Sequence, residues 1–369
     1  MKHIVQVLTD TNVGGAGKYL LNYLKYFDCN TFRVTVILPE GSRLAPYIHL
    51  FDDVTLLEAP HMADMSYNKQ CVAYLKRLFL KIKPDVLHTH ACLSARIAGK
   101  QAKVPVILAT RHCIEPLPHG LKALAISTLN NALCDYYIAV SRAVVTNLLE
   151  SGIKRNKIKL VSNGVQPISP LPPEEIAALR AKYGVQNDET LFGIFGRLEE
   201  VKGHKYFIKA ARQVIREGHK AKFMIVGGGS LESSLRELVN HYHLQDSVIF
   251  TGFVPEVASL LNITDINVNA SESEAMSLSV LEAMSLSKPS IATDAGGNAE
   301  LLKNEESGLL VGYADSASLA SAMIRLMNNP HLASRLAQNA YEKYSRLYTV
   351  ETMVSNLENI YREVLENVD

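Results

Sequence analysis

Long apolar runs are missing from this 369-residue sequence. No stretch approaches the ~18 consecutive apolar residues that a membrane-spanning helix needs. The opening residues, MKHIVQVLTD, enter a strand-like run without the basic region and apolar core of a signal peptide. We therefore expect a cytoplasmic protein, at most associated peripherally with the inner face of the plasma membrane.

The sequence also lacks an excess of positive or negative charge, because it has 38 Lys and Arg and 37 Asp and Glu. This balance gives no general attraction for nucleic acid, so DNA or RNA binding is disfavoured. The cysteines are few, odd in number and without C-x-x-C spacing, which argues against a zinc site and a disulfide framework. Small buried hydrophobic residues are the plainer interpretation of these five positions: Cys29, Cys71, Cys92, Cys113 and Cys134.

Short β-rich runs alternate with helical ones along the whole chain, which predicts parallel sheets covered by helices. The length suits two cores better than one. The alternation breaks near residue 165 at GVQPISPLPPEE, a Pro-rich stretch that we interpret as an interdomain linker. The sequence thus predicts an α/β protein with two domains.

The stretch from Ser271 to Asp294 carries two carboxylates, Glu274 and Glu282, between a strand-like run and a short helix. Ligands of open α/β sheets bind at the carboxyl ends of strands, where helix N-termini attract anions. A carboxylate pair beside an anion site suits a nucleotide sugar, because carboxylates accept hydrogen bonds from hydroxyl groups. Two S-x-x-E capping boxes, at Ser271 and at Ser279, are the structural alternative.

The spacing of Glu274 and Glu282, followed by Ala283-Met284 and by Lys288 to Thr293, resembles the E-x7-E signature of family-4 retaining glycosyltransferases. This resemblance implies the GT-B fold, in which two Rossmann-like domains face each other across a cleft. It implies an acceptor-binding domain over residues 1–165, a nucleotide-sugar-binding domain over 166–347, and a C-terminal helix over 348–369 that returns to the first domain. Apolar residues at helical spacing from Met353 to Leu365 suit that helix.

A glycine-rich loop, Gly14-Gly15-Ala16-Gly17-Lys18, follows the first strand. It is not a P-loop, because Asn12 and Tyr19 stand where that motif needs Gly and Ser or Thr. A plain tight turn is the structural alternative. The family resemblance implies that Gly14, Gly15 and Ala16 approach the phosphate and sugar of the donor.

The stretch FGRLEEVKGHKYFIKAA, residues 195–211, places Arg197 and Lys202 after a strand-like run. Two solvated surface charges would explain them in isolation, but the pattern resembles the pyrophosphate-binding stretch of the family. The resemblance makes both residues a cationic clamp and places the backbone of Phe253 and Val254 against the nucleobase. The helix start that it assigns to the leaving group and sugar comprises Ser277, Leu278 and Ser279.

Three histidines follow strands of the first half: His88, His90 and His112. A structural role and a functional role are equally open for His88 and His90, which lack a third ligand in metal-binding spacing. His112 resembles the family histidine whose ring or backbone touches the transferred sugar. Ser141 and Asn163 also match family positions, but caps at strand ends explain them equally well.

Cleavage of a sugar–phosphate bond leaves negative charge on the diphosphate, which the protein must stabilise. The catalytic set expected from the resemblance is Arg197, Lys202, Glu274 and His112. Neither a metal nor another cofactor is expected, since Asp52-Asp53 lacks D-x-D spacing. A carboxylate nucleophile would explain retention in principle, but the resemblance gives Glu274 a sugar-binding role and favours front-face attack by the acceptor.

Four residues depart from the family pattern and leave the sugar open: Ala275, Met276, Ser279 and Ser287, the last where Gly usually precedes Lys-Pro. We expect transfer of a hexose or N-acetylhexosamine from a nucleotide-diphosphate sugar, with UDP favoured and GDP-mannose as the second option. The acceptor would be a glycan or lipid-linked saccharide in polysaccharide or lipopolysaccharide biosynthesis. A non-hydrolysing epimerase and an inactive nucleotide-sugar-binding protein are the alternatives.

Two segments could bring such an enzyme to an anionic membrane. The first is CVAYLKRLFLKIKPD, from Cys71 to Asp85, with an apolar stripe and basic residues around it; an ordinary helix packed on a core has the same pattern. The second runs from His119 to Leu133 and is apolar and weakly basic.

Overall fold

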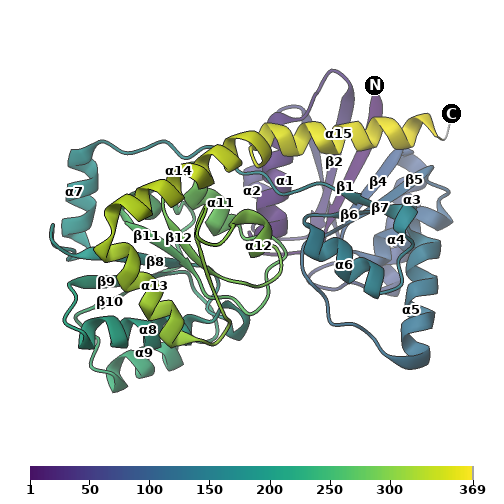
Figure 1. The fold of residues 1–369 in the computed structure, drawn as a ribbon. Helices are drawn as coiled ribbons and strands as arrows, with labels where there is room; N and C mark the ends of the chain where they lie inside the picture. Colours follow the sequence, from purple (N-terminus) through teal and green to yellow (C-terminus); the bar gives the residue numbers. More distant parts are fainter. Residues whose placement is uncertain (368–369) are drawn as a thin grey trace. The chain divides into compact units, whose positions relative to one another are not determined.

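The computed structural model describes residues 1–367 and divides into two compact units, each with its own sheet (Figure 1). Unit 1 comprises Met1–Gly164 and the C-terminal segment that begins at Val350, and unit 2 comprises Val165–Thr349. The prediction of two α/β domains with parallel sheets is confirmed. Val368 and Asp369, the last residues of the predicted C-terminal helix, lie outside the described residues.

The sheet of unit 1 is entirely parallel and has the strand order β3-β2-β1-β4-β5-β6-β7. Its inner strands are almost continuously buried, as expected for a parallel sheet with helices on both faces. The strands are β1 (Lys2–Leu8), β2 (Phe32–Pro39), β3 (Val54–Ala59), β4 (Val86–His90), β5 (Val106–Arg111), β6 (Tyr136–Ala139) and β7 (Ile158–Leu160).

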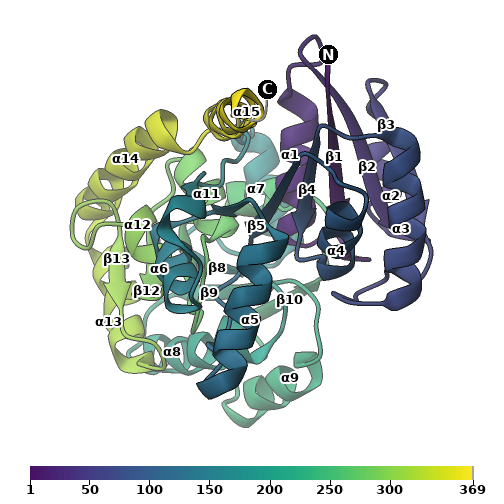
Figure 2. The same cartoon turned by 90° about the vertical axis from the view of Figure 1, so that its right-hand side faces the viewer.

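The C-terminal helix of the chain belongs to unit 1, where it lies beside α1 and completes the core (Figure 2). Its buried face includes Met353, Leu357 and Tyr361. The helices are α1 (Gly15–Tyr26), α2 (Ala45–Ile48), α3 (Lys69–Ile82), α4 (Leu93–Gln101), α5 (Gly120–Leu133), α6 (Arg142–Glu150) and α15 (Val350–Glu366).

The sheet of unit 2 is also parallel and has the order β10-β9-β8-β11-β12-β13. Its strands are short and rich in buried apolar residues, with Phe192 of β8 stacked on Phe223 of β9. The strands are β8 (Thr190–Phe195), β9 (Ala221–Val226), β10 (Val248–Gly252), β11 (Ile266–Asn269), β12 (Ser290–Thr293) and β13 (Leu309–Val311).

The helices of unit 2 bury one apolar face each, most clearly α8, whose residues Phe207, Ile208, Ala211 and Val214 recur at helical spacing and enter the core. The short η2 (Glu200–Lys202) precedes it. The helices are α7 (Pro173–Lys182), α8 (His204–Arg216), α9 (Glu232–His241), α10 (Ala258–Ile263), α11 (Leu278–Ser285), α12 (Asn298–Leu301), α13 (Ser316–Asn328) and α14 (Pro330–Leu347).

Both sheets reverse their strand order once, between β1 and β4 in unit 1 and between β8 and β11 in unit 2. Adjacent connections run to opposite faces at such a point, which opens a crevice at the carboxyl ends of the strands. The loops after these four strands are therefore where each unit can hold a ligand.

The structure decides between the two interpretations of the Cys71–Asp85 segment and corrects the expectation for two cysteines. The apolar stripe of α3 is built from Val72, Leu75 and Phe79, which are buried, so α3 is an ordinary core-facing helix. Cys29 and Cys113 are exposed, whereas Cys71, Cys92 and Cys134 are buried as expected. Among residues 1–367, no helix is both long and apolar enough to cross a bilayer.

Candidate active site

The loop after β8 is held against the loop after β11 by a glycine that cannot be replaced. Gly203 has a φ of +68°, and a Cβ placed on it would lie 2.0 Å from the carbonyl oxygen of Ala270. The amide of Glu272 also donates to the carbonyl oxygen of Val201, at 2.8 Å. This close backbone approach requires glycine and brings Lys202 next to the acidic loop.

Glu274 is the centre of a buried polar cluster in that acidic loop. Its side chain is only 8% exposed, and Oε1 lies 2.7 Å from Nζ of Lys202. The hydroxyl of Ser271 donates to the same oxygen at 2.7 Å, and the amide of Asn269 donates to it at 3.1 Å. A carboxylate with this many donors is fixed in one orientation.

Helix α11 begins at the predicted position, but neither predicted capping box forms. Ser277 is the N-cap, and its hydroxyl accepts a hydrogen bond from the amide of Val280. The hydroxyl of Ser277 also lies 3.1 Å from that of Ser279. Ser271 contacts Glu274 within a loop rather than at a helix start. The first-turn amides of α11 point out of the helix end, as in any helix.

The remaining predicted residues of unit 2 have different environments. Arg197 is exposed at the carboxyl end of β8, whereas Lys202 is half-buried in an ion pair, so the two cations are not alike. Glu282 lies on α11, half-buried and just over one turn from its start. Phe253 is 69% exposed after β10, and Val254 packs against an apolar cluster.

Hydrogen bonds join the loops that follow β8, β9 and β10. The amide of Leu198 donates to the carbonyl oxygen of Gly228 at 3.0 Å, and the amide of Gly227 donates to that of Gly252 at 3.0 Å. Arg197 and Phe253, which lie next to these positions, are therefore carried by one connected edge of the sheet.

The predicted residues of unit 1 gather at its own strand reversal. Gly14 is the N-cap of α1 and provides no side-chain oxygen for the first turn, and Gly15 is exposed. Tyr19, one turn further along α1, is buried and lies edge-on to the ring of His112, with centroids 5.0 Å apart. The glycine loop and His112 are thus connected through a single side chain.

The three histidines form a stack rather than a metal site. His90 lies between His88 and His112, with ring centroids 4.7 and 5.1 Å away. Burial lowers the pKa of His88 to about 3 and that of His112 to about 4, and it holds the pKa of His90 well below its usual value. All three are therefore neutral at pH 7. Within the described part of the chain, no group of His, Cys, Asp or Glu has metal-binding geometry.

Sequence reasoning missed the residues that hold these side chains in place. Asn269 and Ser271 fix Glu274, and Gln6 and Tyr361 fix the histidines. The first pair could have been found from its position at the end of a strand, five and three residues before Glu274. Tyr361 could not, because 273 residues separate it from His88.

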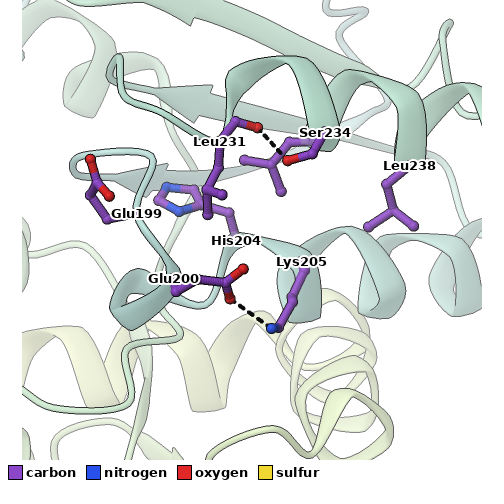
Figure 3. Close-up of a pocket in the computed structure, with 8 residues that line it drawn as sticks. Glu199, Glu200, His204, Lys205, Leu231, Ser234 and Leu238 are labelled. Carbon is purple, nitrogen blue, oxygen red and sulfur yellow. Dashed lines mark hydrogen bonds and ion pairs between the residues drawn. The ribbon is translucent and has the colours of Figure 1, made fainter.

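A pocket of about 220 Å³ lies between α8 and α9, and its lining includes none of the residues predicted for the site (Figure 3). The Glu200–Lys205 ion pair lies at its edge, and Leu231, Leu235 and Leu238 give it an apolar wall. His204 also lines it, and within residues 1–367 neither ring nitrogen has a hydrogen-bond partner. Burial, followed by the charge of Lys202, lowers the pKa of His204 to about 4.

Two family models match consecutive parts of the chain. The model for glycosyl transferases group 1 matches residues 175–343, and the model for glycosyltransferase family 4 matches residues 13–167. The chain belongs to the family-4 glycosyltransferases with the GT-B fold. The first match covers the Lys202–Glu274 site, and the second covers the glycine loop and the histidine stack.

Relatives of this glycosyltransferase match it over nearly its full length. It is 26% identical to the N-acetyl-alpha-D-glucosaminyl L-malate synthase of Bacillus anthracis, over 88% of this chain and 87% of that protein. It is 24% identical to the Escherichia coli UDP-Gal:alpha-D-GlcNAc-diphosphoundecaprenol alpha-1,3-galactosyltransferase, over 96% and 95%. The structure of Anabaena Alr3699/HepE in complex with UDP-glucose has the same fold, with a TM-score of 0.87, 21% identity, and coverage of 98% and 100%.

Proposed function

We propose that this protein is a retaining glycosyltransferase that transfers a hexose or N-acetylhexosamine from a UDP-sugar to a glycan or lipid-linked acceptor in cell-surface polysaccharide synthesis. The observation that carries the proposal is the Lys202–Glu274 pair, which lies at the strand reversal of unit 2 beside the start of α11. A cation, a carboxylate and helix amides together suit a diphosphate linked to a polyhydroxylated ring.

The leaving group needs the most stabilisation. As the bond between the anomeric carbon and the diphosphate oxygen breaks, that oxygen takes the electron pair. Arg197, Lys202 and the amides from Ser277 to Ser279 stabilise the developing charge, and no metal is required for this role. The acceptor oxygen attacks the same face of the sugar and passes its proton to the leaving phosphate, so the anomeric configuration is retained.

The other residues bind the donor. Lys202, Ser271 and Asn269 all donate hydrogen bonds to Oε1 of Glu274. We therefore assign the other oxygen, Oε2, as the acceptor for a sugar hydroxyl. Glu282 accepts from the ribose, and the backbone at Phe253 and Val254 contacts the nucleobase. In unit 1, His112 contacts the transferred sugar, with the Gly14–Ala16 loop close to the donor phosphate.

The relatives support a UDP-sugar as the donor and a lipid-linked saccharide as the acceptor. The E. coli relative is named for UDP-Gal and a diphosphoundecaprenol acceptor, and the Anabaena protein was solved with UDP-glucose. The B. anthracis relative, in contrast, is named for L-malate, a soluble acceptor. A soluble acceptor is therefore the competing expectation.

A donor panel tests the proposal. Labelled UDP- and GDP-sugars are incubated with the protein, with and without lipid-linked or soluble saccharide acceptors. We expect nucleotide release that depends on acceptor, with a UDP-sugar, and an α-linked product from an α-linked donor. Sugar isomerisation without nucleotide release would identify an epimerase, and binding without either reaction would identify an inactive nucleotide-sugar-binding protein.

Helix α5 is the surface that we propose for contact with an anionic membrane. It has no buried residue, and Leu121, Leu124 and Leu129 are 88%, 65% and 46% exposed, with Lys122 between the first two. Exposed leucines beside a basic residue suit the boundary between lipid headgroups and acyl chains. The apolar stripe of α3, by contrast, is used within the unit.

Vesicle sedimentation tests this surface. The double variant L121S/L124S should lose binding to anionic vesicles at low salt, whereas L80S, which removes a 53% exposed leucine from α3, should retain it. If the wild type stays in the supernatant, or if both variants sediment equally, the membrane proposal fails and a soluble acceptor is the better reading.

A further inference from the structure

A hydrogen-bond chain runs through the core of unit 1, from the last helix of the protein to His112. Nε2 of Gln6 donates to the hydroxyl of Tyr361 at 2.8 Å, and Oε1 of Gln6 lies 2.9 Å from Nε2 of His90. Nδ1 of His90 in turn lies 2.8 Å from Nε2 of His112. Gln6 is on β1, His90 ends β4, and Tyr361 is on α15, so three distant segments meet in this chain.

The direction of each link follows from the orientation of the Gln6 amide, whose nitrogen faces Tyr361. The carbonyl oxygen of Gln6 can only accept, so the proton of His90 is on Nε2. Burial keeps His90 neutral, so its Nδ1 carries a lone pair and accepts from Nε2–H of His112. His112 is neutral as well, because burial lowers its pKa to about 4, which leaves a lone pair on its Nδ1.

Tyr361 lies at the end of the chain opposite His112 and joins Gln6 to His88. Its hydroxyl accepts from Gln6 and therefore donates to Nδ1 of His88, 2.6 Å away, while Nε2 of His88 donates to the hydroxyl of Thr110 at 2.6 Å. With both roles of its hydroxyl in use, Tyr361 couples the orientation of the Gln6 amide to the tautomer of His88.

We propose that Tyr361 is a positioning residue for glycosyl transfer: through Gln6 and His90 it fixes His112 as the Nε2–H tautomer and so presents Nδ1 of His112 as a hydrogen-bond acceptor for a sugar hydroxyl. The inference rests on the proposed function, because it takes His112 to contact the transferred sugar. It assigns to the C-terminal helix a role in the site beyond completing the core. Outer residues of this kind set the tautomer and ring orientation of histidines elsewhere.

Tyr23 shows that packing alone does not require the Tyr361 hydroxyl. Both tyrosines are buried in the same core, with rings in edge contact at a centroid distance of 6.1 Å. The hydroxyl of Tyr23 has no hydrogen-bond partner among residues 1–367, whereas that of Tyr361 has two. Y23F and Y361F therefore each remove a tyrosine hydroxyl from the same core. Only Y361F removes a hydroxyl that belongs to the hydrogen-bond chain.

The tautomer can be read directly by long-range ¹H–¹⁵N spectra of protein labelled at histidine, with the His112 signals assigned from H112Q. We expect Nε2–H at His90 and His112 in the wild type and in Y23F. In Y361F the His112 signals should move toward a mixture of tautomers, and kcat for transfer from the UDP-sugar should fall about 10-fold with KM changed less. Should Y361F fail to fold, Q6M breaks the same chain while Tyr361 remains.

A wild-type His112 protonated on Nδ1 would overturn the proposal, as would Y361F or Q6M spectra and kcat that match those of Y23F. The spectra do not depend on catalysis, so the two proposals can fail separately. If Y361F changes the tautomer of His112 but the wild type transfers no sugar, the hydrogen-bond chain is supported and the proposed function is refuted. Normal transfer with no change in any variant refutes the chain alone.

Discussion

Lys202 and Glu274 form an ion pair with an Nζ–Oε1 distance of 2.7 Å, although 72 positions separate them in the sequence. The pair joins the loop after β8 to the loop after β11, at the strand reversal of unit 2. Glu274 is nearly buried, whereas Lys202 retains a quarter of its side-chain exposure. Lys202 can therefore contact a ligand while its charge also compensates the carboxylate, so the catalytic role that we propose for it is compatible with its structural one.

Arg197→Ala and Lys202→Ala should both lower kcat for glycosyl transfer, by about 10²-fold or more, because each removes a cation from the leaving diphosphate. Their effects on stability should differ. Arg197 is exposed, so its removal should change the free energy of unfolding by no more than about 0.5 kcal/mol. Removal of Lys202 leaves Glu274 without its counter-charge and should cost about 1–3 kcal/mol.

Activity assays and urea unfolding on the same preparations check both effects. Near-normal turnover in either variant would refute the diphosphate assignment for that residue. Equal unfolding free energies for the two variants would instead show that the ion pair contributes nothing to the fold.

The two glutamates should separate binding from turnover. Glu282→Ala should weaken UDP binding, measured by calorimetry, since we place its carboxylate on the ribose. Glu274→Ala should lower kcat more than it lowers UDP affinity, because the lost contacts are to the sugar. Glu274→Gln retains the shape and serves as the control for packing. Unchanged UDP affinity in Glu282→Ala would contradict the first assignment.

Local pattern was enough to predict most of the fold. Alternating β and helical runs gave both parallel sheets, and the helical spacing from Met353 to Leu365 gave α15. These features are local, since apolar periodicity records which face of an element is buried. The position of Glu274 after β11 and of Lys202 before α8 also followed from the order of the elements.

The contacts of the site could not be predicted in the same way. Whether Lys202 is solvated or paired depends on the backbone approach of Gly203 to Ala270, which no local pattern records. The S-x-x-E spacing was ambiguous, because Ser277 competes with Ser279 for the N-cap and only the path of the chain decides. The exposure of α5 and the burial of α3 likewise depend on what packs against each helix.

Ser287→Gly should stabilise the protein. Ser287 is exposed and has a φ of +51°, in the left-handed region that costs a non-glycine residue about 1 kcal/mol. Glycine, which is usual at this position in the family, removes that cost but adds flexibility to the unfolded chain. We expect a net gain of about 0.5 kcal/mol and a slightly higher Tm by scanning calorimetry, with no change in kcat. A lower Tm would mean that the Ser287 side chain stabilises the turn.

The protein should lose stability as the pH falls from 7.5 to 5.5, because His88, His90 and His204 are buried and neutral in the folded state. Burial lowers the pKa of His88 to about 3 and that of His204 to about 4, from 6.5 in both cases, and it holds the pKa of His90 well below 6.5. In this range the unfolded chain binds more protons than the folded one, so the free energy of unfolding rises with pH. The stabilisation is fully present above pH 6.5 and is lost as the pH falls toward 4. At pH 5.5, one unit below the unfolded pKa, each histidine should account for about 1.4 kcal/mol.

Urea unfolding at pH 7.5 and 5.5 measures this loss, in a range where carboxylates stay ionised in both states. His88, His90 and His204 should together account for about 4 kcal/mol of the loss between the two values, at ~1.4 kcal/mol each, and His112, whose pKa burial also lowers to about 4, should add about 1.4 kcal/mol. His204→Leu removes one of these four titrating groups without touching the histidine stack, so it should reduce the loss by about a quarter, or ~1.4 kcal/mol. A free energy of unfolding that is the same at both pH values, or a loss unaffected by His204→Leu, would show that these rings are not neutral and enclosed in solution.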